Sequence, residues 1–340
     1  MTEPTNPTNP ANPANPANPA NPAIPVTDAG IDELAARLAP FGDRLRRDEP
    51  LGPMTTYRVG GRAALFVEAA TVDDLRMIGA ARHGLDTQVL VIGRGSNMLV
   101  ADDGFVGLAL VLGAGFATLR IDGTSVEVGG SASLPVVARR TAAAGLRGFE
   151  WAVGVPGSMG GAVRMNAGGH GSDIAASVER VRVVDLDGGE TVEMGAAQLT
   201  FGYRSSALRA TQVVVTAHLR LRTGDRTEAE SEIADIVRWR REHQPGGTNA
   251  GSVFTNPQGD SAGRLIDAAG CRGLRIGTAE VSDKHANFIQ TDPSGTAADV
   301  TAVMAEVRRR VSRASGIDLH AETRLVGFDA ATARAAGGRP

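Results

Sequence analysis

Residues 89–100 read Val89-Leu-Val-Ile-Gly93-Arg-Gly95-Ser96-Asn97-Met-Leu-Val100, a glycine loop between two short apolar runs. The first run has the composition of a buried strand, and the second run leads into Asp102-Asp103-Gly104, which ends any helix there. Because glycine permits positive φ and close backbone approach, such a loop can offer several N–H groups to one anion. The pattern predicts a strand, an anion-binding loop and a second strand.

This loop differs from the two common glycine motifs of nucleotide sites. It lacks the third glycine and the following helix of a Gly-x-Gly-x-x-Gly fingerprint, and it lacks the Gly-Lys-Ser/Thr of a P-loop. We therefore expect a pyrophosphate cradle of the strand–loop–strand kind, which favours a flavin dinucleotide over a nicotinamide or a triphosphate. A plain tight turn is the alternative explanation of the same residues.

Composition limits the classes of protein to consider. The 340 residues are 42% hydrophobic and 21% charged, which is ordinary for a globular protein. A net charge of −3 and a pI near 6.1 argue against a general nucleic-acid or membrane-surface binder. The single cysteine, Cys271, excludes an internal disulfide and suits the cytoplasm, and its setting predicts a small buried residue. No segment approaches the ~20 apolar residues of a membrane span.

The order of predicted elements gives an α+β fold in three parts. The Asn-Pro-rich tail, residues 1–27, cannot bury apolar surface and is expected to stay disordered, outside the fold. A small α/β part follows over 28–94, a strand-rich part over 95–224, and a third part over 225–321. The closing strand, 322–329, is assigned to the first part. Within these parts, the pattern also predicts a hairpin at Asp187-Gly188-Gly189 and a strand over 286–290.

Seven glycines fall between Gly154 and Gly171, a density that argues against an ordinary helix or strand. The segment is either a mobile surface loop or backbone packed closely on a flat ligand. Interleaved apolar residues, among them Val155 and Met159, favour packing.

Three polar residues stand alone among small or apolar neighbours, namely Arg204, Ser252 and Glu322. Taken singly, each has an ordinary explanation: a solvated cation, a turn residue and a charge at a strand end. The spacing gives no Ser-His-Asp set and no metal-ligand pair among the six histidines, so no metal is expected.

Six motifs together point further, because they occur in one order between about residues 45 and 328. They resemble those of the UDP-N-acetylenolpyruvoylglucosamine reductase (MurB) family: Gly93–Asn97, Val155–Ser158, Asn166–Gly168, Phe201–Arg204, Gly251–Phe254 with Asn256-Pro257, and Glu322–Arg324. The resemblance implies an FAD-binding fold of the vanillyl-alcohol-oxidase (PCMH) type. Residues 28–94 and 95–224 would hold FAD non-covalently, and residues 225–321 would form the substrate domain.

The resemblance also implies a reaction and a site. NADPH would reduce the flavin, which would reduce the enolpyruvyl ether of a UDP-N-acetylglucosamine substrate to the lactyl ether of UDP-N-acetylmuramate. Arg204 and Glu322 would stabilise negative charge at C2, and Ser252 would protonate it. The implied cofactor residues are Tyr57, Gly93, Gly95, Ser96, Asn97, Leu99, Val155, Pro156, Gly157, Gly161, Gly168, Arg240 and Arg324. The implied substrate residues are Tyr203, His243, Asn256, Lys284 and His285.

Two features set this chain apart within the family pattern. Too few residues separate Arg204, Ser252 and Glu322 for a tyrosine-bearing loop, so the chain resembles the shorter subtype. His243 stands where family members tend to carry a lysine, and a neutral imidazole contacts a diphosphate more weakly. We expect a cytoplasmic monomer that acts on a nucleotide sugar and binds neither nucleic acid nor membrane. The alternatives are another FAD oxidoreductase of this fold, or a catalytically silent FAD or nucleotide-sugar binding protein.

Overall fold

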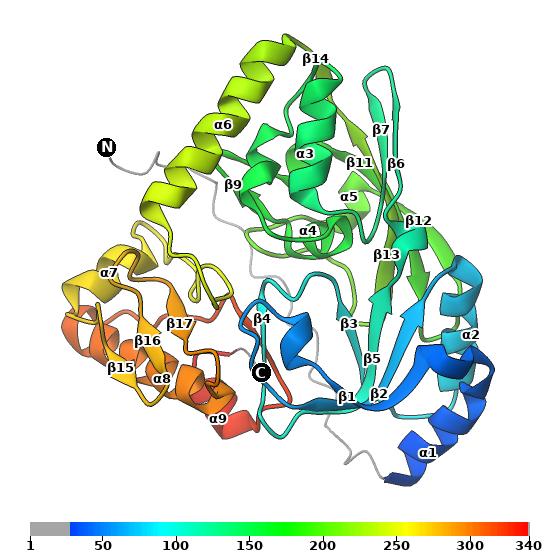
Figure 1. The fold of residues 1–340 in the computed structure, drawn as a ribbon, viewed down its shortest axis with the longest axis horizontal. Helices are drawn as coiled ribbons and strands as arrows, with labels where there is room; N and C mark the ends of the chain where they lie inside the picture. The colour runs from blue at the N-terminus through cyan, green and yellow to red at the C-terminus, as the bar shows by residue number, and fades with distance from the viewer. Residues whose placement is uncertain (1–27, 339–340) are drawn as a thin grey trace. The chain divides into compact units, whose positions relative to one another are not determined.

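A computed structural model describes residues 28–338 (Figure 1), and these residues fall into two units. The first unit contains the residues up to 45, 67–93 and 110–240, and the second contains 46–66, 94–109 and the chain from 241 onward. The chain passes from one unit to the other inside β1 (Leu45–Pro50), β2 (Arg62–Ala69), β5 (Phe105–Leu112) and α6 (Arg226–His243), and between Gly93 and Arg94 of the glycine loop. The predicted boundaries at residues 28, 95 and 225 stay a prediction, and the Asn-Pro-rich tail lies outside the described residues.

An antiparallel sheet of order β12-β11-β13-β7-β6 forms the centre of the first unit (Figure 1). Its strands are β6 (Leu119–Asp122), β7 (Ser125–Gly129), β11 (Val178–Asp185), β12 (Thr191–Gly195) and β13 (Gln212–Arg220). Val184 lies opposite Thr191, so the hairpin predicted at residues 187–189 is confirmed. Val126, Val181 and Ala217, from three of its strands, are fully buried in one apolar core.

One helix of the first unit, α2 (Val72–Arg82), begins with a pair of residues that cap it. The Thr71 hydroxyl accepts from Asp74 N–H (3.1 Å), and the Asp74 carboxylate accepts from Thr71 N–H (3.1 Å). This reciprocal pair is a capping box, which satisfies two orphan donors of the first turn. The remaining helices and strands that lie wholly in this unit are α1 (Asp28–Arg37), α3 (Leu134–Ala143), α4 (Met159–Met165), α5 (Ala196–Leu199), β3 (Val89–Ile92), β8 (Leu146–Arg147), β9 (Gly168–Gly169), β10 (Ser172–Asp173) and β14 (Arg222–Thr223).

The expectation that the glycine-rich segment 154–171 contains no ordinary helix is wrong. Residues Met159–Met165 form α4, whose first turn is capped by the Ser158 hydroxyl (3.4 Å from Gly161 N). A Cβ on Gly160 would lie 3.2 Å from Gly130 O, so glycine lets this helix pack closely on the central sheet. The apolar residues Met159 and Val163 supply its buried face. Helix packing here compensates for the low helix propensity of glycine.

The second unit is built on a three-stranded antiparallel sheet of order β15-β16-β17, packed against α8. Its elements are α7 (Ala262–Ala268), β15 (Arg275–Ile276), β16 (Ala279–Val281), β17 (Ile289–Thr291), α8 (Ala297–Ser315) and α9 (Ala330–Ala335). The long helix α8 turns an apolar stripe to the core of this unit, with Val300, Val303 and Val307 buried at its centre. Thr296 is the N-cap of α8, and Asp102 from a distant segment accepts from Ala297 N–H and Ala298 N–H (2.9 Å each) in the same first turn.

The closing strand pairs with the strand that leaves the glycine loop. β18 (Arg324–Val326) runs parallel to β4 (Met98–Val100), with Leu325 opposite Leu99. The strand predicted over 322–329 is therefore present but shorter. The strands β1, β2, β5 and β3 form a separate sheet, in the order β1-β2-β5-β3.

The strand predicted over 286–290 is partly wrong, since β17 begins only at Ile289. Phe288 N–H donates to His285 O (3.0 Å), which closes a turn before the strand. Asn287 uses its backbone carbonyl and its side chain on another segment, described below. An apolar run alone could not reveal this, because it reports burial and not hydrogen-bond partners.

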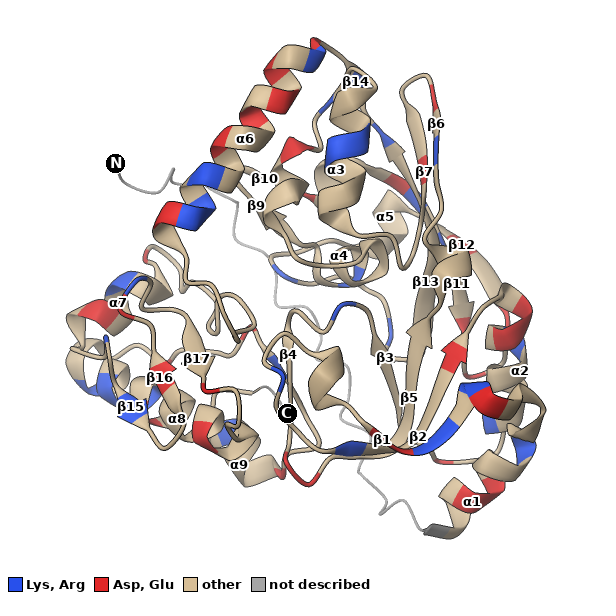
Figure 2. Ribbon diagram, viewed as in Figure 1, with Lys and Arg blue, Asp and Glu red and all other residues tan. Residues whose placement is uncertain are grey.

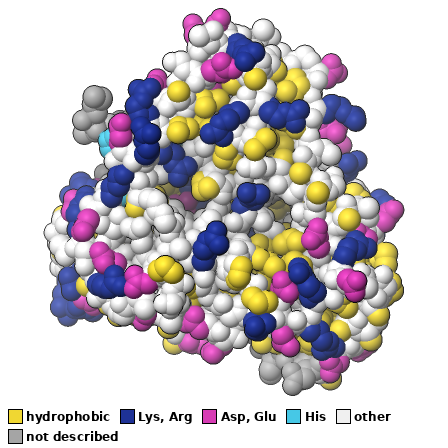
Figure 3. All heavy atoms as spheres, viewed as in Figure 1, with side chains coloured by type: hydrophobic (Ala, Val, Ile, Leu, Met, Phe, Trp, Pro, Cys, Tyr) yellow, Lys and Arg dark blue, Asp and Glu magenta, His cyan; other side chains and the backbone are white. Residues whose placement is uncertain are grey.

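Charge is mixed along the chain. Figure 2 shows acidic residues in the first half of α6 and arginines toward its end, an arrangement that complements the helix dipole. Figure 3 shows basic and acidic side chains interspersed on the face that it draws.

Within residues 28–338, no helix combines the length and the apolar character that a membrane crossing requires. The short 3-10 helices are η1 (Ala39–Arg44), η2 (Gly52–Met54), η3 (Ala114–Phe116), η4 (Glu150–Gly154) and η5 (Ile174–Ala176).

Candidate active site

The glycine loop has the strand–loop–strand form that its sequence predicted, with β3 before it and β4 after it. Gly95 has φ +60°, and a Cβ there would lie only 2.1 Å from Met54 O, so no other residue fits. Thr56 N–H donates to Gly95 O (3.1 Å). Among residues 28–338, no backbone partner accepts from the N–H groups of Arg94, Gly95 or Ser96. These amides can therefore receive an anion such as a pyrophosphate.

Tyr57 follows Thr56 in the chain and is fully buried in the core of the second unit. Its hydroxyl has no hydrogen-bond partner among the described residues, although buried polar groups are nearly always paired. Burial raises the pKa of Tyr57, so the phenol stays a neutral donor. An unpaired buried donor is a candidate partner for a phosphate or flavin oxygen, and the role of Tyr57 toward FAD stays a prediction.

Asn97 joins the glycine loop to the segment that carries Glu322. The Asn97 side-chain amide donates to Glu322 O (3.2 Å), and Arg324 N–H donates to Asn97 O (3.1 Å). The pairing of β4 with β18 continues this contact, with the buried Leu99 opposite Leu325. The loop predicted to bind cofactor and the predicted catalytic carboxylate are thus adjacent within the second unit.

The segment that carries Ser252 lies on the other side of Glu322. Val253 O accepts from Glu322 N–H (2.8 Å) and from Thr323 N–H (3.3 Å). Phe254 forms an antiparallel bridge with Ala321, and Thr255 N–H donates to His320 O (2.9 Å). Ser252 and Glu322, which are 70 positions apart in sequence, therefore occupy neighbouring backbone segments.

Arg324 and Arg240, both predicted to bind the cofactor, lie in settings that suit a ligand. Loss of hydration lowers the pKa of each guanidinium, in the second and the first unit respectively. Arg324 nevertheless keeps much of its surface accessible. The Arg324 side chain is thus surrounded by protein atoms and still accessible to solvent, so a ligand can bind against it.

The predicted substrate residues of the second unit have defined places. Lys284 Nζ donates to Arg241 O (2.5 Å) in the last turn of α6, where a cation is favourable. His285 Nδ1 accepts from Asn287 N–H (3.2 Å). The amide oxygen of Asn256 accepts from Ala262 N–H (2.9 Å), which leaves its amide nitrogen on an exposed side chain. His243 is exposed at the end of α6.

In the first unit, the start of the glycine loop touches the second predicted cofactor motif. A Cβ on Gly93 would lie 2.3 Å from the Ser158 hydroxyl and would force that hydroxyl away from Gly161 N–H, which it caps. The motif Val155-Pro156-Gly157 is held by bonds from Gly157 N–H to Val155 O (2.8 Å) and from Leu134 N–H to Gly157 O (3.0 Å). Gly161 follows in the first turn of α4.

Arg204 and Tyr203 form the remaining cluster of the first unit. Arg204 has a positive φ of 54°, and its guanidinium donates to Gly168 O (3.0 Å) and lies 5.1 Å from the centre of the Tyr203 ring. Asn166, 5% exposed, donates to Gly202 O (3.1 Å) and so holds the turn before Arg204. The convergence of Arg204 with Ser252 and Glu322 stays a prediction.

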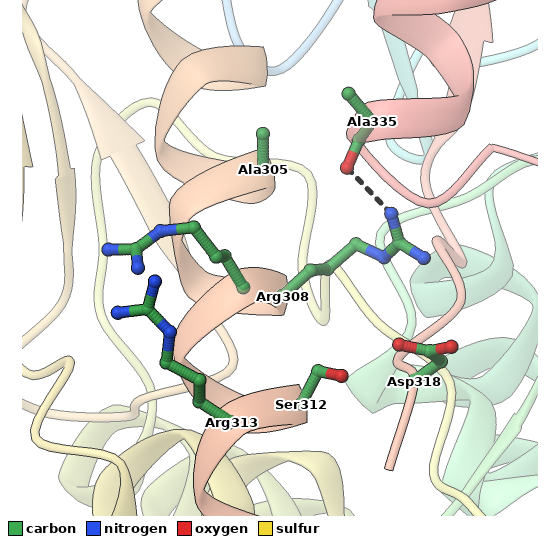
Figure 4. Close-up of a pocket in the computed structure, with 7 residues that line it drawn as sticks. Ala305, Arg308, Ser312, Arg313, Asp318 and Ala335 are labelled. Carbon is green, nitrogen blue, oxygen red and sulfur yellow. Dashed lines mark hydrogen bonds between the residues drawn. The ribbon is translucent and has the colours of Figure 1, made fainter. Parts of the chain in front are cut away.

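A surface pocket lies elsewhere in the second unit, between α8 and α9 (Figure 4). Figure 4 shows Arg308 directed at the end of α9, where it donates to Ala335 O (2.7 Å). Arg308 also donates to Leu319 O (2.7 Å), so this guanidinium serves the fold. The pocket contains none of the predicted site residues.

Among residues 28–338, no group of three or more His, Cys, Asp or Glu side chains could hold a metal ion. Cys271 is fully buried, as predicted, and burial raises the pKa of its thiol, which disfavours the reactive thiolate.

Sequence reasoning missed two asparagines and one aspartate that organise these segments. Asn166, Asn287 and Asp102 each hold a neighbouring segment with the side chain. Asn166 lies inside a quoted motif, but nothing in the local pattern of Asn287 or Asp102 indicates which distant backbone they meet. Their roles depend on tertiary contacts only.

Comparison with known proteins assigns the family. Residues 243–326 match the family model of the C-terminal domain of UDP-N-acetylenolpyruvoylglucosamine reductase, and residues 63–195 match that of an FAD binding domain. Reductases of this name from Paramagnetospirillum magneticum and Symbiobacterium thermophilum are 42% and 41% identical, each over 84% of this chain and 92% and 93% of their own lengths. The crystal structure of the Thermus caldophilus enzyme (MurB) superposes with a TM-score of 0.73 at 34% identity, over 83% of this chain and 99% of that one. These matches confirm the predicted α+β fold with an FAD-binding part, and the chain belongs to the UDP-N-acetylenolpyruvoylglucosamine reductase family.

Proposed function

We propose that this chain is an NADPH-dependent flavoenzyme that reduces enolpyruvyl-UDP-N-acetylglucosamine to UDP-N-acetylmuramate, a precursor of peptidoglycan. The observation that carries the proposal is the arrangement in the second unit. There, the backbone of Glu322 is bonded on one side to Asn97 of the glycine loop and on the other side to Val253, next to Ser252. The backbone segments that carry Glu322 and Ser252 are thus bonded to each other and to the glycine loop, and this supports their proposed roles.

Bound FAD, once reduced by NADPH, supplies the two-electron reduction of the vinyl carbon C3 of the substrate. The residues expected to hold it are those of the glycine loop, together with Tyr57, Arg240 and Arg324. The unpaired Tyr57 hydroxyl and the partly desolvated arginines support this assignment.

Reduction at C3 leaves negative charge at C2, conjugated with the substrate carboxylate. Arg204 offers a planar fork of N–H donors, fixed in part by Gly168 O, and such preorganised donors stabilise developing charge. Glu322 serves either as a protonated donor or by holding its partners. Removal of one such donor typically lowers the rate by ~10²–10³.

Ser252 donates the proton that completes the reaction at C2. A serine hydroxyl is a weak acid in water, but an enolate-type carbanion is basic enough to accept its proton. General acid catalysis of this kind contributes ~10²–10⁴ in rate when the donor lies within hydrogen-bond reach of the acceptor. The predicted substrate residues, among them Lys284 and His285, would bind the diphosphate and sugar.

We further propose that the enzyme acts as a monomer in the cytoplasm and belongs to the shorter subtype of the family. The short spacings between Arg204, Ser252 and Glu322 support the subtype, because they leave no room for a tyrosine-bearing loop.

The proposal is tested with the purified protein in two steps. Its visible spectrum should show flavin that is released by acid precipitation, as non-covalent binding requires. NADPH oxidation should then depend on enolpyruvyl-UDP-N-acetylglucosamine and yield a product heavier by two hydrogens. UDP-N-acetylglucosamine, which lacks the double bond, should cause no NADPH oxidation and yield no reduced product. Flavin without substrate-dependent NADPH oxidation would instead indicate a silent binding protein.

A further inference from the structure

Asn287 is a buried asparagine that contacts the backbone beside Ser252. Only 3% of its surface is exposed. Its amide nitrogen donates to Phe254 O (2.8 Å), and its amide oxygen accepts from Phe254 N–H (3.0 Å). Its own backbone carbonyl accepts from Val253 N–H (2.9 Å). Three hydrogen bonds thus join one residue to the two positions that follow Ser252.

The side-chain amide of Asn287 bonds to the backbone of Phe254 as the backbone of a neighbouring β-strand would. A primary amide carries one acceptor and two donors at a fixed spacing, so it can bond both the N–H and the C=O of a single residue. Phe254 is 1% exposed, and its polar backbone groups would lose water without gaining a partner if this amide were absent. Buried backbone groups therefore make this segment dependent on Asn287.

The opposite side of the segment is also fixed. Val253 O accepts from Glu322 N–H (2.8 Å) and Thr323 N–H (3.3 Å). The residues after Ser252 are therefore held between Asn287 and the Glu322 segment. The backbone position of Ser252 therefore depends on the hydrogen bonds of the two residues that follow it, Val253 and Phe254.

We propose that Asn287 is a positioning residue that holds Ser252 in place for proton transfer to the substrate, an inference that rests on the proposed function of Ser252. Asn287 acts through backbone that it holds and needs no contact with substrate. Proton transfer requires the donor oxygen within about 2.6–3.2 Å of its acceptor. Because a displacement of about 1 Å can cost ~10²-fold in rate, loosening this segment should slow the protonation step by ~10–100-fold.

The test compares the two half-reactions of the FAD-loaded enzyme with Asn287→Ala. Reduction of the flavin by NADPH does not involve Ser252, whereas anaerobic reoxidation by enolpyruvyl-UDP-N-acetylglucosamine does. We expect Asn287→Ala to keep the first rate, per bound flavin, and to lower the second ~10–100-fold. Equal effects on both half-reactions, or none on reoxidation, would overturn the proposal.

Two controls separate positioning from general loss of stability. Met304→Ala removes a fully buried side chain of α8 in the same core and should lower the melting temperature while leaving both rates per bound flavin unchanged. Asn287→Asp can regain the donor–acceptor pair when its carboxyl is protonated, so its reoxidation rate relative to the parent enzyme should rise as pH falls. A Met304→Ala variant with the same selective loss, or an Asn287→Asp ratio that does not change with pH, counts against positioning.

Ser252→Ala distinguishes failure of this inference from failure of the proposed function. If Ser252→Ala leaves the rate of reoxidation unchanged, Ser252 is not the proton donor, and the proposed mechanism is wrong at that step. If Ser252→Ala slows reoxidation, Asn287→Ala in that background should add less than 2-fold, because residues that act as a unit are not additive. A full additional loss in the double variant would show that Asn287 acts independently of Ser252.

Discussion

Gly95→Ala tests whether the glycine loop requires the positive φ and the close backbone contacts that are found at Gly95. Two costs arise at this position. The first is φ +60°, since an L-residue in the left-handed region loses about 1–2 kcal/mol relative to glycine. The second is the Cβ itself, which would lie 2.1 Å from Met54 O and 2.6 Å from Thr55 Cα. Neither contact is with a side chain that could turn away, and forced overpacking typically costs about 1–3 kcal/mol.

The sum for Gly95→Ala is roughly 2–5 kcal/mol of unfolding free energy. Gly84→Ala is the matched control, because Gly84 has φ +77° and a Cβ there would meet no atom within 4 Å, so only the cost of about 1–2 kcal/mol applies. Thermal unfolding with and without excess FAD measures both variants, and the ratio of visible flavin absorbance to protein absorbance reports bound flavin. Gly95→Ala should lose stability and flavin, whereas Gly84→Ala should keep its flavin. A Gly95→Ala protein as stable and as yellow as Gly84→Ala would refute the reasoning.

Three further predictions concern the fold. Asp102→Ala removes the acceptor of two N–H groups in the first turn of α8 and should lower the free energy of unfolding by about 0.5–2 kcal/mol in urea titrations, whereas Asp103→Ala, at the exposed neighbouring position, should change it by less than about 0.5 kcal/mol. Burial opposes ionisation of Asp74, but hydrogen bonds from Arg44 and from two backbone N–H groups outweigh it and lower its pKa. Its stabilisation is thus present above the unfolded pKa of about 3.9 and is lost as pH falls through the folded value; Asp74→Asn should lower the melting temperature at pH 7 and progressively less toward pH 3. Buried Cys271, whose thiol pKa is raised, should react slowly with iodoacetamide in the native protein and rapidly in urea, and fast native labelling would contradict its burial.

Much of the local structure follows from the sequence because its causes are local. The capping pair Thr71 and Asp74 lies within one helical turn, and the hairpin at residues 187–189 depends on its own glycines. The glycine loop likewise has apolar runs that mark both of its strands. In these cases, the residues that cause the structure are neighbours in the chain.

The errors arise where distant residues decide. α4 forms in a glycine-rich segment because Gly160 packs on backbone from the central sheet, which local propensity does not report. The strand over 286–290 is shortened because Asn287 bonds to the Ser252 segment. The pairing of β18 with β4 joins residues more than 200 positions apart, so alternation of apolar residues could suggest a strand but not its partner.

The candidate site shows the same division. Arg204, Ser252 and Glu322 are identified through resemblance, since each alone has an ordinary explanation. The structure adds that Ser252 and Glu322 lie on bonded segments beside the glycine loop. It also adds Asn287, whose significance depends on the backbone that it meets.

The most direct test of the central claim is the rate at which enolpyruvyl-UDP-N-acetylglucosamine reoxidises the NADPH-reduced protein in the absence of oxygen. We predict rapid reoxidation of the parent enzyme and a rate ~10²–10⁴ lower in Ser252→Ala, with flavin reduction by NADPH unchanged in both. A reduced parent enzyme that this substrate fails to reoxidise, or a Ser252→Ala enzyme that reacts as fast as its parent, would contradict the account.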